Sequence, residues 1–474
     1  MSESIEADIC VIGAGSAGLS IAAGASQMGA KTVLIEKGRM GGDCLNYGCV
    51  PSKSLLVAGK AAQAYRLAAR LGVRYAAPEV DFQAVHDHVQ GVIAAIAPND
   101  SVERFEGLGV TVIQGAARFT GQQELEVNGT RIRARRVVIA TGSQPFVPPI
   151  PGLEGVPYLT NETVFDLTEL PEQLVVLGGG PIGCELGQAF RHLGARVSVV
   201  EMFEILPKDD PELVDVVRGR LLADGVELYE GAKVTAVSGR PGAVGVTLEQ
   251  NSQAKQIAGS ALLLAAGRRA VLEGLNLEAA GVDRDETGLV IDARLRTSNP
   301  KVYAAGDAAG GYQFTHVAGY HAGIVIRNAL FRLPAKADAA AVPWVTYTSP
   351  ELANVGLSEA AARQQSGEIN VLRWPFAEND RAQAERRTEG LIKVITRPNG
   401  RILGAAIAGA QAGELIHPWV LALSQKLKIG AMAGLIAPYP TLGEVGKRAA
   451  GTFYMPKLFS DRTRTIVRFL ARFG

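Results

Sequence analysis

The sequence is poor in cysteine, in aromatic residues and in net charge. Only four of its 474 residues are cysteine, and the aromatic residues make up 6%. So few cysteines exclude a disulfide-stapled scaffold and favour a reducing, cytoplasmic compartment. The 48 basic residues nearly balance 47 acidic ones, so the whole chain presents no excess charge that would attract nucleic acid or anionic lipid. Small molecules are therefore the expected partners.

Long apolar runs are also absent. No stretch approaches the roughly 20 apolar residues that span a bilayer. Met1 to Asp8 carries three acidic residues instead of the basic start of a secretory signal. Neither an integral membrane segment nor a secretion signal is expected. His86 and His88 lie two positions apart, a spacing that does not share a helix face, so no metal site is expected.

Glycine, by contrast, is abundant, with 55 residues, and strand-like runs alternate with Ala-rich helical patterns. This alternation is typical of doubly wound α/β units. One such unit occurs twice, as ADICVIGAGSAGLSIAAGASQMGAKTVLIEK at residues 7–37 and as QLVVLGGGPIGCELGQAFRHLGARVSVVEM at residues 173–202. Each copy reads as a strand, a glycine-rich turn, a helix and a second strand.

Both copies carry the glycine pattern of a dinucleotide-binding turn. In this pattern the glycines permit the tight turn, the approach of a pyrophosphate and close helix packing, while the helix N-terminus offers amide donors. An acidic residue is expected about 20 positions on, to bind a ribose. The residues that fit are Gly13, Gly15, Gly18 and Glu36 in the first copy, and Gly178, Gly180, Gly183 and Glu201 in the second. Because a carboxylate repels a 2′-phosphate, Glu201 favours NAD(H) over NADP(H).

A close cysteine pair follows the first copy. The segment GGDCLNYGCVPSK, at residues 41–53, places Cys44 and Cys49 five positions apart where the chain should enter a helix. A cysteine at a helix N-terminus near a cation has a depressed pKa and becomes a nucleophile. Lys53, four residues after Cys49, would share its helix face. The pair is thus a redox candidate, whereas Cys10 and Cys184 are expected to be inert buried thiols.

These motifs together resemble the class I pyridine nucleotide-disulfide oxidoreductases, which include dihydrolipoamide dehydrogenase, glutathione reductase and mercuric reductase. The resemblance covers nearly the whole chain. GGDCLNYGCVPSK is similar to the family's active-disulfide signature. The segments around Thr141–Gly142, Gly267 and Gly306–Asp307 are similar to family motifs at which the chain returns to the FAD-binding domain.

The resemblance implies two Rossmann-type dinucleotide-binding domains, for FAD and NAD(H), and a C-terminal α+β dimerisation domain in a homodimer. It implies that Asp307 lies near the FAD ribityl chain and that Lys53 pairs with Glu185 beside the flavin. Cys49 would exchange electrons with the flavin, and Cys44 would attack the substrate. The resemblance also implies a set of cofactor-binding residues: the two glycine patterns together with Glu36, Lys37, Gly42, Lys53, Thr141, Gly142, Gly267 and Gly306.

The expected division of the chain follows from the repeat, from a proline-rich stretch at residues 145–157 and from a second break at residues 332–343. Residues 1–148 would form the first part of the FAD domain, 149–270 the NAD(P) domain and 271–340 the second part of the FAD domain. Residues 341–474 would form the interface domain, with strands at Leu391 to Thr396 and Leu403 to Ala408 followed by helices. The Arg-rich tail from Lys457 to Gly474 is expected to dock onto the protein itself, with a membrane-surface helix as the alternative.

One catalytic segment departs from the family pattern. Disulfide-reducing members carry a His before Pro-Thr and an orienting Glu, whereas this chain has Tyr439 at the His position and keeps Glu444. Tyrosine is a poor thiol base at neutral pH. The Tyr439 frame resembles mercuric reductase, yet the chain ends in RFLARFG without that enzyme's cysteine pair. His316 is a candidate replacement proton carrier.

Three functions therefore stay open at the level of sequence. The first is an NAD(P)H-linked dithiol or disulfide oxidoreductase, similar to dihydrolipoamide dehydrogenase, that acts on a small-molecule disulfide, dithiol or other acceptor. The second is a metal-ion or quinone reductase of mercuric reductase type. The third is a redox-sensing flavoprotein without turnover, which has no need of the full relay of Cys44, Cys49, Lys53 and Glu185.

Overall fold

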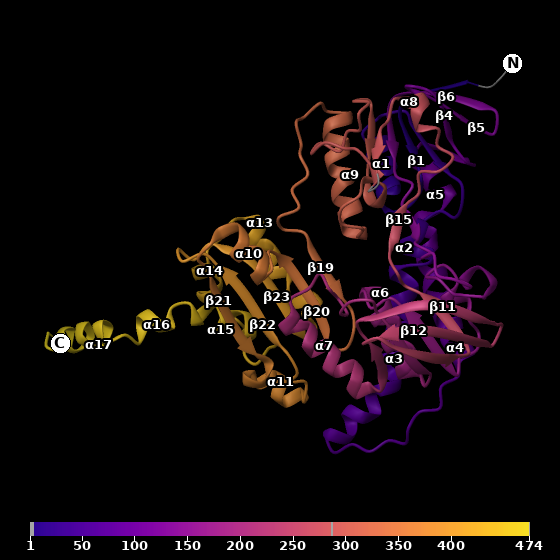
Figure 1. Cartoon of the computed structure of the whole chain (residues 1–474). Coiled ribbons are helices and arrows are strands. Elements are labelled where there is room, and N and C mark those ends of the chain that lie inside the picture. The colour runs from indigo at the N-terminus through magenta and orange to yellow at the C-terminus, as the bar shows by residue number, and fades with distance from the viewer. Residues whose placement is uncertain (1–3, 286–287, 474) are drawn as a thin grey trace.

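A computed structural model describes residues 4–285 and 288–473, and three main sheets organise it (Figure 1). None of the helices in these ranges is long and apolar enough to cross a membrane. The predicted class, two doubly wound α/β units and a C-terminal α+β unit, is confirmed. The predicted domain boundaries themselves stay a prediction.

The first sheet is built around parallel strands. In spatial order they are β3 (Val110–Gln114), β2 (Thr32–Glu36), β1 (Ser4–Ile12) and β6 (Thr130–Ile139), and the late strand β18 (Val302–Ala304) also pairs with β6. β5 (Glu124–Val127) and β4 (Arg118–Gly121) extend the sheet antiparallel from β6. Helices α1 (Ser16–Gln27) and α9 (Thr315–Ala329) pack together on it. The strands are rich in Val and Ile because both faces are covered.

The second sheet repeats this plan on a smaller scale. Its parallel strands follow the order β10 (Val226–Tyr229), β9 (Arg196–Val200), β8 (Gln173–Leu177) and β14 (Ala261–Leu264). Helices α6 (Pro181–Leu193) and α7 (Pro211–Asp224) belong to this unit, and the antiparallel strands β11 (Ala232–Arg240), β12 (Ala243–Gln250) and β13 (Gln253–Gly259) form a meander beside it.

The two units are joined at two places. The strand that leaves the first unit, β7 (Ser143–Pro145), pairs antiparallel with the strand that returns to it, β15 (Arg268–Ala270). In addition, α3 (Cys49–Arg70) and α4 (Phe82–Ile96) pack against the second unit, and the rings of Phe82 and Phe190 lie 6.0 Å apart. The helix that begins at Cys49 therefore reaches from one unit to the other. Shorter helices here are α2 (Gly42–Asn46), α5 (Val102–Gly107) and α8 (Leu277–Ala280).

The C-terminal unit is a five-stranded antiparallel sheet flanked by helices. Its strand order is β19 (Pro343–Thr346), β20 (Glu351–Gly356), β23 (Ile402–Gly409), β22 (Leu391–Thr396) and β21 (Asn370–Pro375). The two predicted strands are confirmed as β22 and β23, and the other three were missed. Its helices are α10 (Glu359–Ser366), α11 (Asp380–Glu385), α12 (Ala412–Leu415), α13 (His417–Ser424), α14 (Ile429–Ala433) and α15 (Glu444–Thr452).

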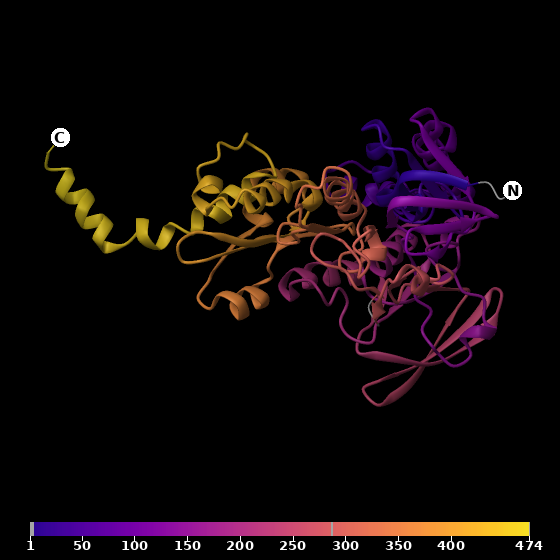
Figure 2. The same ribbon diagram turned by 90° about the horizontal axis from the view of Figure 1, so that it is seen from above.

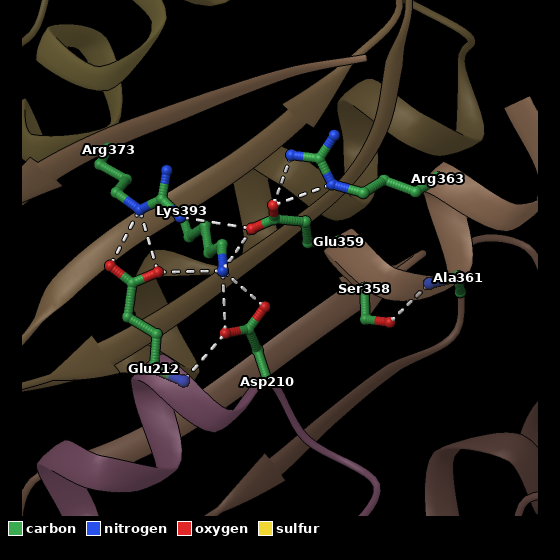
Figure 3. Close-up of polar contacts among 8 residues, drawn as sticks. All are labelled: Asp210, Glu212, Ser358, Glu359, Ala361, Arg363, Arg373 and Lys393. Atoms are coloured by element: carbon green, nitrogen blue, oxygen red, sulfur yellow. Dashed lines mark hydrogen bonds and ion pairs between the residues drawn. The ribbon is translucent and has the colours of Figure 1, made fainter. Parts of the chain in front are cut away.

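A buried ion cluster fastens this sheet to the second unit (Figure 3). Lys393 of β22, which is 5% exposed, contacts Asp210 at 2.8 Å, Glu212 at 3.0 Å and Glu359 at 2.7 Å. Asp210 is also the N-cap of α7, where it accepts a hydrogen bond from the Glu212 amide at 3.1 Å. Arg373 bridges Glu212 and Glu359 at 2.9 and 3.3 Å. One lysine thus neutralises carboxylates from two separate units.

The chain ends in an arm that lies apart from the three sheets. It consists of α16 (Met455–Leu458) and α17 (Asp461–Leu470), and both views show it projecting beyond the C-terminal sheet (Figures 1 and 2). No residue of either helix is buried. Within the described chain, the expected docking of this tail onto the protein therefore does not occur.

Candidate active site

The two glycine-rich turns have nearly the same geometry. Gly13 and Gly178 have φ angles of +104° and +115°, and a Cβ atom there would lie 2.4 and 2.3 Å from a carbonyl oxygen of the neighbouring strand end. At the third glycines, Gly18 and Gly183, a Cβ would lie 1.8 and 1.9 Å from the carbonyl oxygen of the first. Only glycine fits these positions. Gly15 and Gly180 precede α1 and α6, and Gly180 faces open space, as a pyrophosphate cradle requires.

The predicted acidic residues lie at the same place in both units. Glu36 accepts a hydrogen bond from the Ala14 amide at 2.6 Å, and Glu201 accepts one from the Gly179 amide at 2.6 Å. Each carboxylate therefore braces its own glycine turn at the end of the second strand. This is the position from which a carboxylate binds the ribose of a dinucleotide.

The cysteine pair begins next to the first glycine turn. Gly41 donates a backbone hydrogen bond to the Ala14 carbonyl at 3.0 Å, so α2 starts against that turn. Cys44 lies in α2 and Cys49 is the first residue of α3. Both are free thiols, and the Cys49 sulfur lies 3.5 Å from the Thr315 hydroxyl at the start of α9. Two helix N-termini thus meet at Cys49.

The two thiols differ in acidity. A hydrogen bond from the Cys44 thiol lowers the pKa of Cys49 to about 6, with further lowering by Thr315 and the Lys53 ammonium. The same bond raises the pKa of Cys44, as does burial. The reduced pair therefore holds one thiolate, on Cys49, and one proton, on Cys44. Burial raises the pKa of Cys10 to about 12 and that of Cys184 still further, which fits inert thiols.

Alkylation should reveal this difference. In the anaerobically reduced protein, the rate at which iodoacetamide modifies Cys49 should reach half its plateau near pH 6, because the thiolate is the reactive form. Replacing Cys44 by alanine removes the donated hydrogen bond and should move the midpoint toward the ordinary value of about 8.5. Peptide mapping by mass spectrometry gives both rates. A midpoint that is the same in both proteins would contradict the assignment.

An ion pair links the cysteine helix to the second unit. The Lys53 ammonium in α3 lies 2.7 Å from the carboxylate of Glu185, a buried residue of α6. It also lies 4.4 Å from the ring centre of Tyr347, whose amide donates to Glu185 at 2.9 Å. All three main units therefore contribute to the surroundings of Lys53. The predicted pairing of Lys53 with Glu185 is present in the structure.

A polar chain connects Asp307 to the cysteine loop. The Ser143 hydroxyl donates to Asp307 at 2.5 Å and accepts from Arg268 at 2.8 Å. Arg268 also pairs with Asp43, the residue before Cys44, at 3.0 Å. Asn161 donates to Asp43 at 2.9 Å and to the Tyr47 carbonyl at 3.2 Å. The strands β7 and β15 that join the two units thus hold both Asp307 and the cysteine loop.

His316 lies beside the cysteines without touching them. Its Nε2 atom donates to the Pro343 carbonyl at 2.8 Å, and its ring stacks on Phe314 at 5.3 Å. Its neighbour Thr315 makes the contact to Cys49 instead. A second histidine, His321, is buried and accepts a hydrogen bond from the Gly306 amide at 3.3 Å. Burial lowers its pKa, so it stays neutral and supports the turn that presents Asp307.

The other predicted residues fall into two groups. Thr141 and Gly142 bond to Val271, through the Thr141 hydroxyl at 2.6 Å and the Gly142 carbonyl at 3.1 Å. The cofactor-binding candidates Lys37, Gly42, Gly267 and Gly306 lie at the ends of strands or the start of α2.

Tyr439 and Glu444 lie in the C-terminal unit, where the Tyr439 hydroxyl donates to Asp380 at 2.8 Å. That carboxylate raises the pKa of Tyr439. Tyr439 is 69% exposed.

Several site residues were not foreseen. Thr315, Asp43, Asn161, Ser143 and Tyr347 meet the predicted residues only through the fold. Arg268 could have been predicted as a site residue from the sequence, since it follows Gly267 in a recognised motif. Among the residues that the structure describes, no three His, Cys, Asp or Glu side chains form a metal-binding group.

Comparisons with known proteins agree with this arrangement. Residues 7–322 match the family model described as pyridine nucleotide-disulphide oxidoreductase, and residues 342–450 match its dimerisation domain. The chain is 37% identical to a mercuric reductase of Lysinibacillus sphaericus over 451 residues, covering 94% of this chain and 82% of that protein. It is also 37% identical to a dihydrolipoyl dehydrogenase of Thermus scotoductus over 455 residues, covering 92% and 95%.

A solved structure with the same fold is the Cu(II) complex of the HOCl-induced flavoprotein disulfide reductase RclA from Escherichia coli. It superposes with a TM-score of 0.85 at 28% identity, covering 94% of this chain and 99% of that one. The relatives thus include proteins named for a metal ion and proteins named for a dithiol.

Proposed function

Because the chain belongs to the class I pyridine nucleotide-disulfide oxidoreductase family, an enzyme family that uses FAD and a pyridine nucleotide, we propose that it is an NADH-linked dithiol–disulfide oxidoreductase. The observation that carries this proposal is a pair of neighbouring cysteines, Cys44 in α2 and Cys49 at the start of α3, whose pKa values are shifted in opposite directions. The segment that carries the pair starts against the first dinucleotide turn. The helix of Cys49 is joined to the second unit by the Lys53–Glu185 ion pair.

The cradles of this chain fit the two nucleotides. The turn from Gly13 to Gly18, Glu36 and Asp307 would hold FAD, and the turn from Gly178 to Gly183 with Glu201 would hold NAD(H). When bound, the flavin supplies a two-electron carrier between nicotinamide and the cysteines. Lys53, fixed by Glu185, would place a positive charge near that carrier.

The proposed chemistry of the cysteines is thiol–disulfide exchange. The Cys44 thiol first gives up its proton to a base, and the resulting thiolate attacks one sulfur of a disulfide acceptor; the first acceptor thiolate leaves and takes up a proton. Cys49 then attacks the Cys44 sulfur of the mixed disulfide, which releases the second acceptor thiol and leaves a Cys44–Cys49 disulfide. His316, one residue from the Cys49 contact Thr315, is the proposed proton carrier on the same chain.

We further assign Tyr439 and Glu444 to the acceptor side of a homodimer. A dimerisation-domain match and the 69% exposure of Tyr439 support an interface at this face. The Asp380 bond holds the Tyr439 hydroxyl protonated, so this tyrosine would orient an acceptor by hydrogen bonding and would not act as a base. The low cysteine content, four of 474 residues, favours a reducing compartment and supports a cytoplasmic location.

The proposed function is tested by counting the reactive cysteine thiols per chain before and after NADH is added. Anaerobic addition of NADH to the oxidised protein should make two further cysteines reactive per chain, and peptide mapping should assign them to Cys44 and Cys49. Acceptors such as lipoamide, glutathione disulfide or a quinone should then reoxidise the pair. If NADH changes the reactivity of neither cysteine, the proposal is wrong and a flavoprotein without a working disulfide remains.

A second candidate function is reduction of a metal ion held by the two cysteines. The mercuric reductase relatives and the Cu(II) complex of RclA support it, as does Tyr439 in place of the histidine. NADH oxidation that needs Hg(II) or Cu(II), with no turnover of disulfides, would favour this function over disulfide exchange.

The nucleotide preference rests on Glu201. We expect a higher kcat/KM with NADH than with NADPH, because this carboxylate would repel a 2′-phosphate. Replacing Glu201 by alanine should lower kcat/KM for NADH about tenfold, through loss of a charged hydrogen bond, and raise it for NADPH. The exposed neighbour Glu204, replaced by alanine, is the matched control and should leave the NADH to NADPH ratio unchanged. A ratio that Glu201→Ala leaves intact would contradict the assignment.

A further inference from the structure

The terminal arm, defined here as Met455–Phe473, exposes apolar side chains that nothing in the described chain covers. Ile466, Phe469 and Leu470 of α17 are 48%, 55% and 59% exposed, and Phe459 between α16 and α17 is 67% exposed. The arm projects from the C-terminal unit in two perpendicular views (Figures 1 and 2). Large apolar side chains gathered in this way mark an interaction surface.

The apolar residues of α17 share one side of the helix. With 3.6 residues per turn, Ile466, Val467, Phe469 and Leu470 fall within about 160° of arc. Arg464 and Arg468 lie one turn apart on the other side, and Arg472 follows at the same spacing. Ser460 caps the helix by accepting a hydrogen bond from the Thr463 amide at 3.3 Å. The short segment is therefore a well-defined two-sided helix.

The arm is also strongly basic, although the whole chain is nearly neutral. It carries Lys457, Arg462, Arg464, Arg468 and Arg472 against a single acid, Asp461. Among the described residues, Arg464 pairs with Asp461 at 3.4 Å, and the other four basic side chains form no ion pair. Arg462 lies on the apolar side in the first turn, where its long stem can reach outward.

We propose that this arm binds the surface of an anionic phospholipid bilayer. A helix with an apolar side of Phe, Leu and Ile and a cationic opposite side lies in the interfacial plane of such a bilayer. The apolar side would enter the acyl boundary, and the unpaired arginines would contact lipid phosphates. The dimerisation-domain match ends at residue 450, before the arm begins.

The alternative occupant of the apolar side is a second copy of this chain. A helix that docks on a protein turns its polar side to water, and that side needs no single sign of charge. Here all the basic side chains except Arg464 lack a partner, and the only carboxylate lies in the first turn. The uniform charge therefore favours an anionic lipid surface.

Vesicle sedimentation of the full-length, flavin-loaded protein tests the proposal. We expect binding to vesicles of equal amounts of phosphatidylcholine and phosphatidylglycerol, and none to phosphatidylcholine alone. Replacing Arg464, Arg468 and Arg472 by glutamate should weaken binding by on the order of 100-fold, because each basic residue contributes about fivefold at such a surface. Phe469→Ser with Leu470→Ser should weaken it as well.

The matched control replaces three exposed basic residues without ion pairs elsewhere, Arg74, Arg240 and Lys336, by glutamate. This control should bind vesicles like the unaltered protein, and all variants should keep their flavin absorbance and NADH oxidation. Equal loss in the control, or no binding that depends on phosphatidylglycerol, would overturn the proposal. So would arm variants that change the dimer mass by light scattering while vesicle binding stays constant, since the occupant would then be a second copy.

Discussion

Replacing Cys49 by serine should lower NADH-driven turnover of every disulfide acceptor at least ~10³-fold, because a hydroxyl can neither carry the thiolate charge nor close the disulfide. The variant should still bind flavin, since the glycine turn and Glu36 that would hold the dinucleotide are unchanged. It should also lose the long-wavelength absorption band that a thiolate beside an oxidised flavin produces. Anaerobic NADH titration followed by visible spectroscopy, together with steady-state rates, measures all three.

Two further variants sharpen this test. Cys44→Ser should lose disulfide turnover to a similar extent but keep the band, because the thiolate belongs to Cys49. Cys184→Ser is the matched control, since its thiol is buried and donates only to the Gly179 carbonyl at 3.2 Å. Turnover that survives in Cys49→Ser would mean that the acceptor takes electrons without the cysteine pair.

Replacing Lys393 by methionine should lower the free energy of unfolding by about 3–5 kcal/mol. Methionine fills a similar volume but leaves Asp210, Glu212 and Glu359 without their shared cation. The largest cost falls on Asp210, because the loss of a partner for a buried carboxylate costs more than the pair itself contributes. Urea unfolding that follows the tryptophan fluorescence of the C-terminal unit is the measurement.

The control is Arg363→Met, which removes a largely exposed partner of the same Glu359 carboxylate. An exposed pair of this kind contributes at most about 1 kcal/mol. Equal losses in Lys393→Met and Arg363→Met would mean that the buried cluster does not fasten the two units together.

Acid should act on the same cluster. The Lys393 hydrogen bond is the largest of the effects that lower the pKa of Glu359 from 4.5 to about 2, and Arg363 and Arg373 add to it. The folded state therefore holds the ionised form more tightly than the unfolded chain does. The resulting stability is fully present above pH 4.5 and is lost as the pH falls through about 2. In Lys393→Met, most of this dependence should disappear from the unfolding free energy measured across that window.

The site was predictable wherever local backbone geometry restricts the residue type. Gly13, Gly18, Gly178 and Gly183 are required by backbone contacts within each turn, so the pattern is visible in a single stretch of sequence. Cys44, Cys49 and Lys53 are likewise close in the chain. The pairing of Lys53 with Glu185, 132 residues away, followed only from the family resemblance and not from local pattern.

The contacts that the sequence could not supply all depend on the packing of distant segments. Thr315 reaches Cys49 across 266 residues, and Arg268 reaches Asp43 from the returning strand. In the C-terminal unit, β19, β20 and β21 were missed because their short runs mix proline, polar and charged residues. Tertiary pairing decides such strands more than propensity does. The exposure of the arm was also not predictable, since an amphipathic pattern alone does not show whether its apolar side is covered.

The pairing of β7 with β15 bears on how such an enzyme can be rebuilt. The chain leaves the first unit through Ser143–Pro145 and returns through Arg268–Ala270, and neighbouring strands lie about 5 Å apart. The two ends of the intervening segment therefore lie side by side in one pair of strands. A segment whose ends are close together can be exchanged with little disturbance to the rest of the fold. A segment with another nucleotide preference could be exchanged there, provided that Ser143 and Arg268 remain at the two junctions and that the new segment keeps Asn161 and Glu185, which contact Asp43 and Lys53.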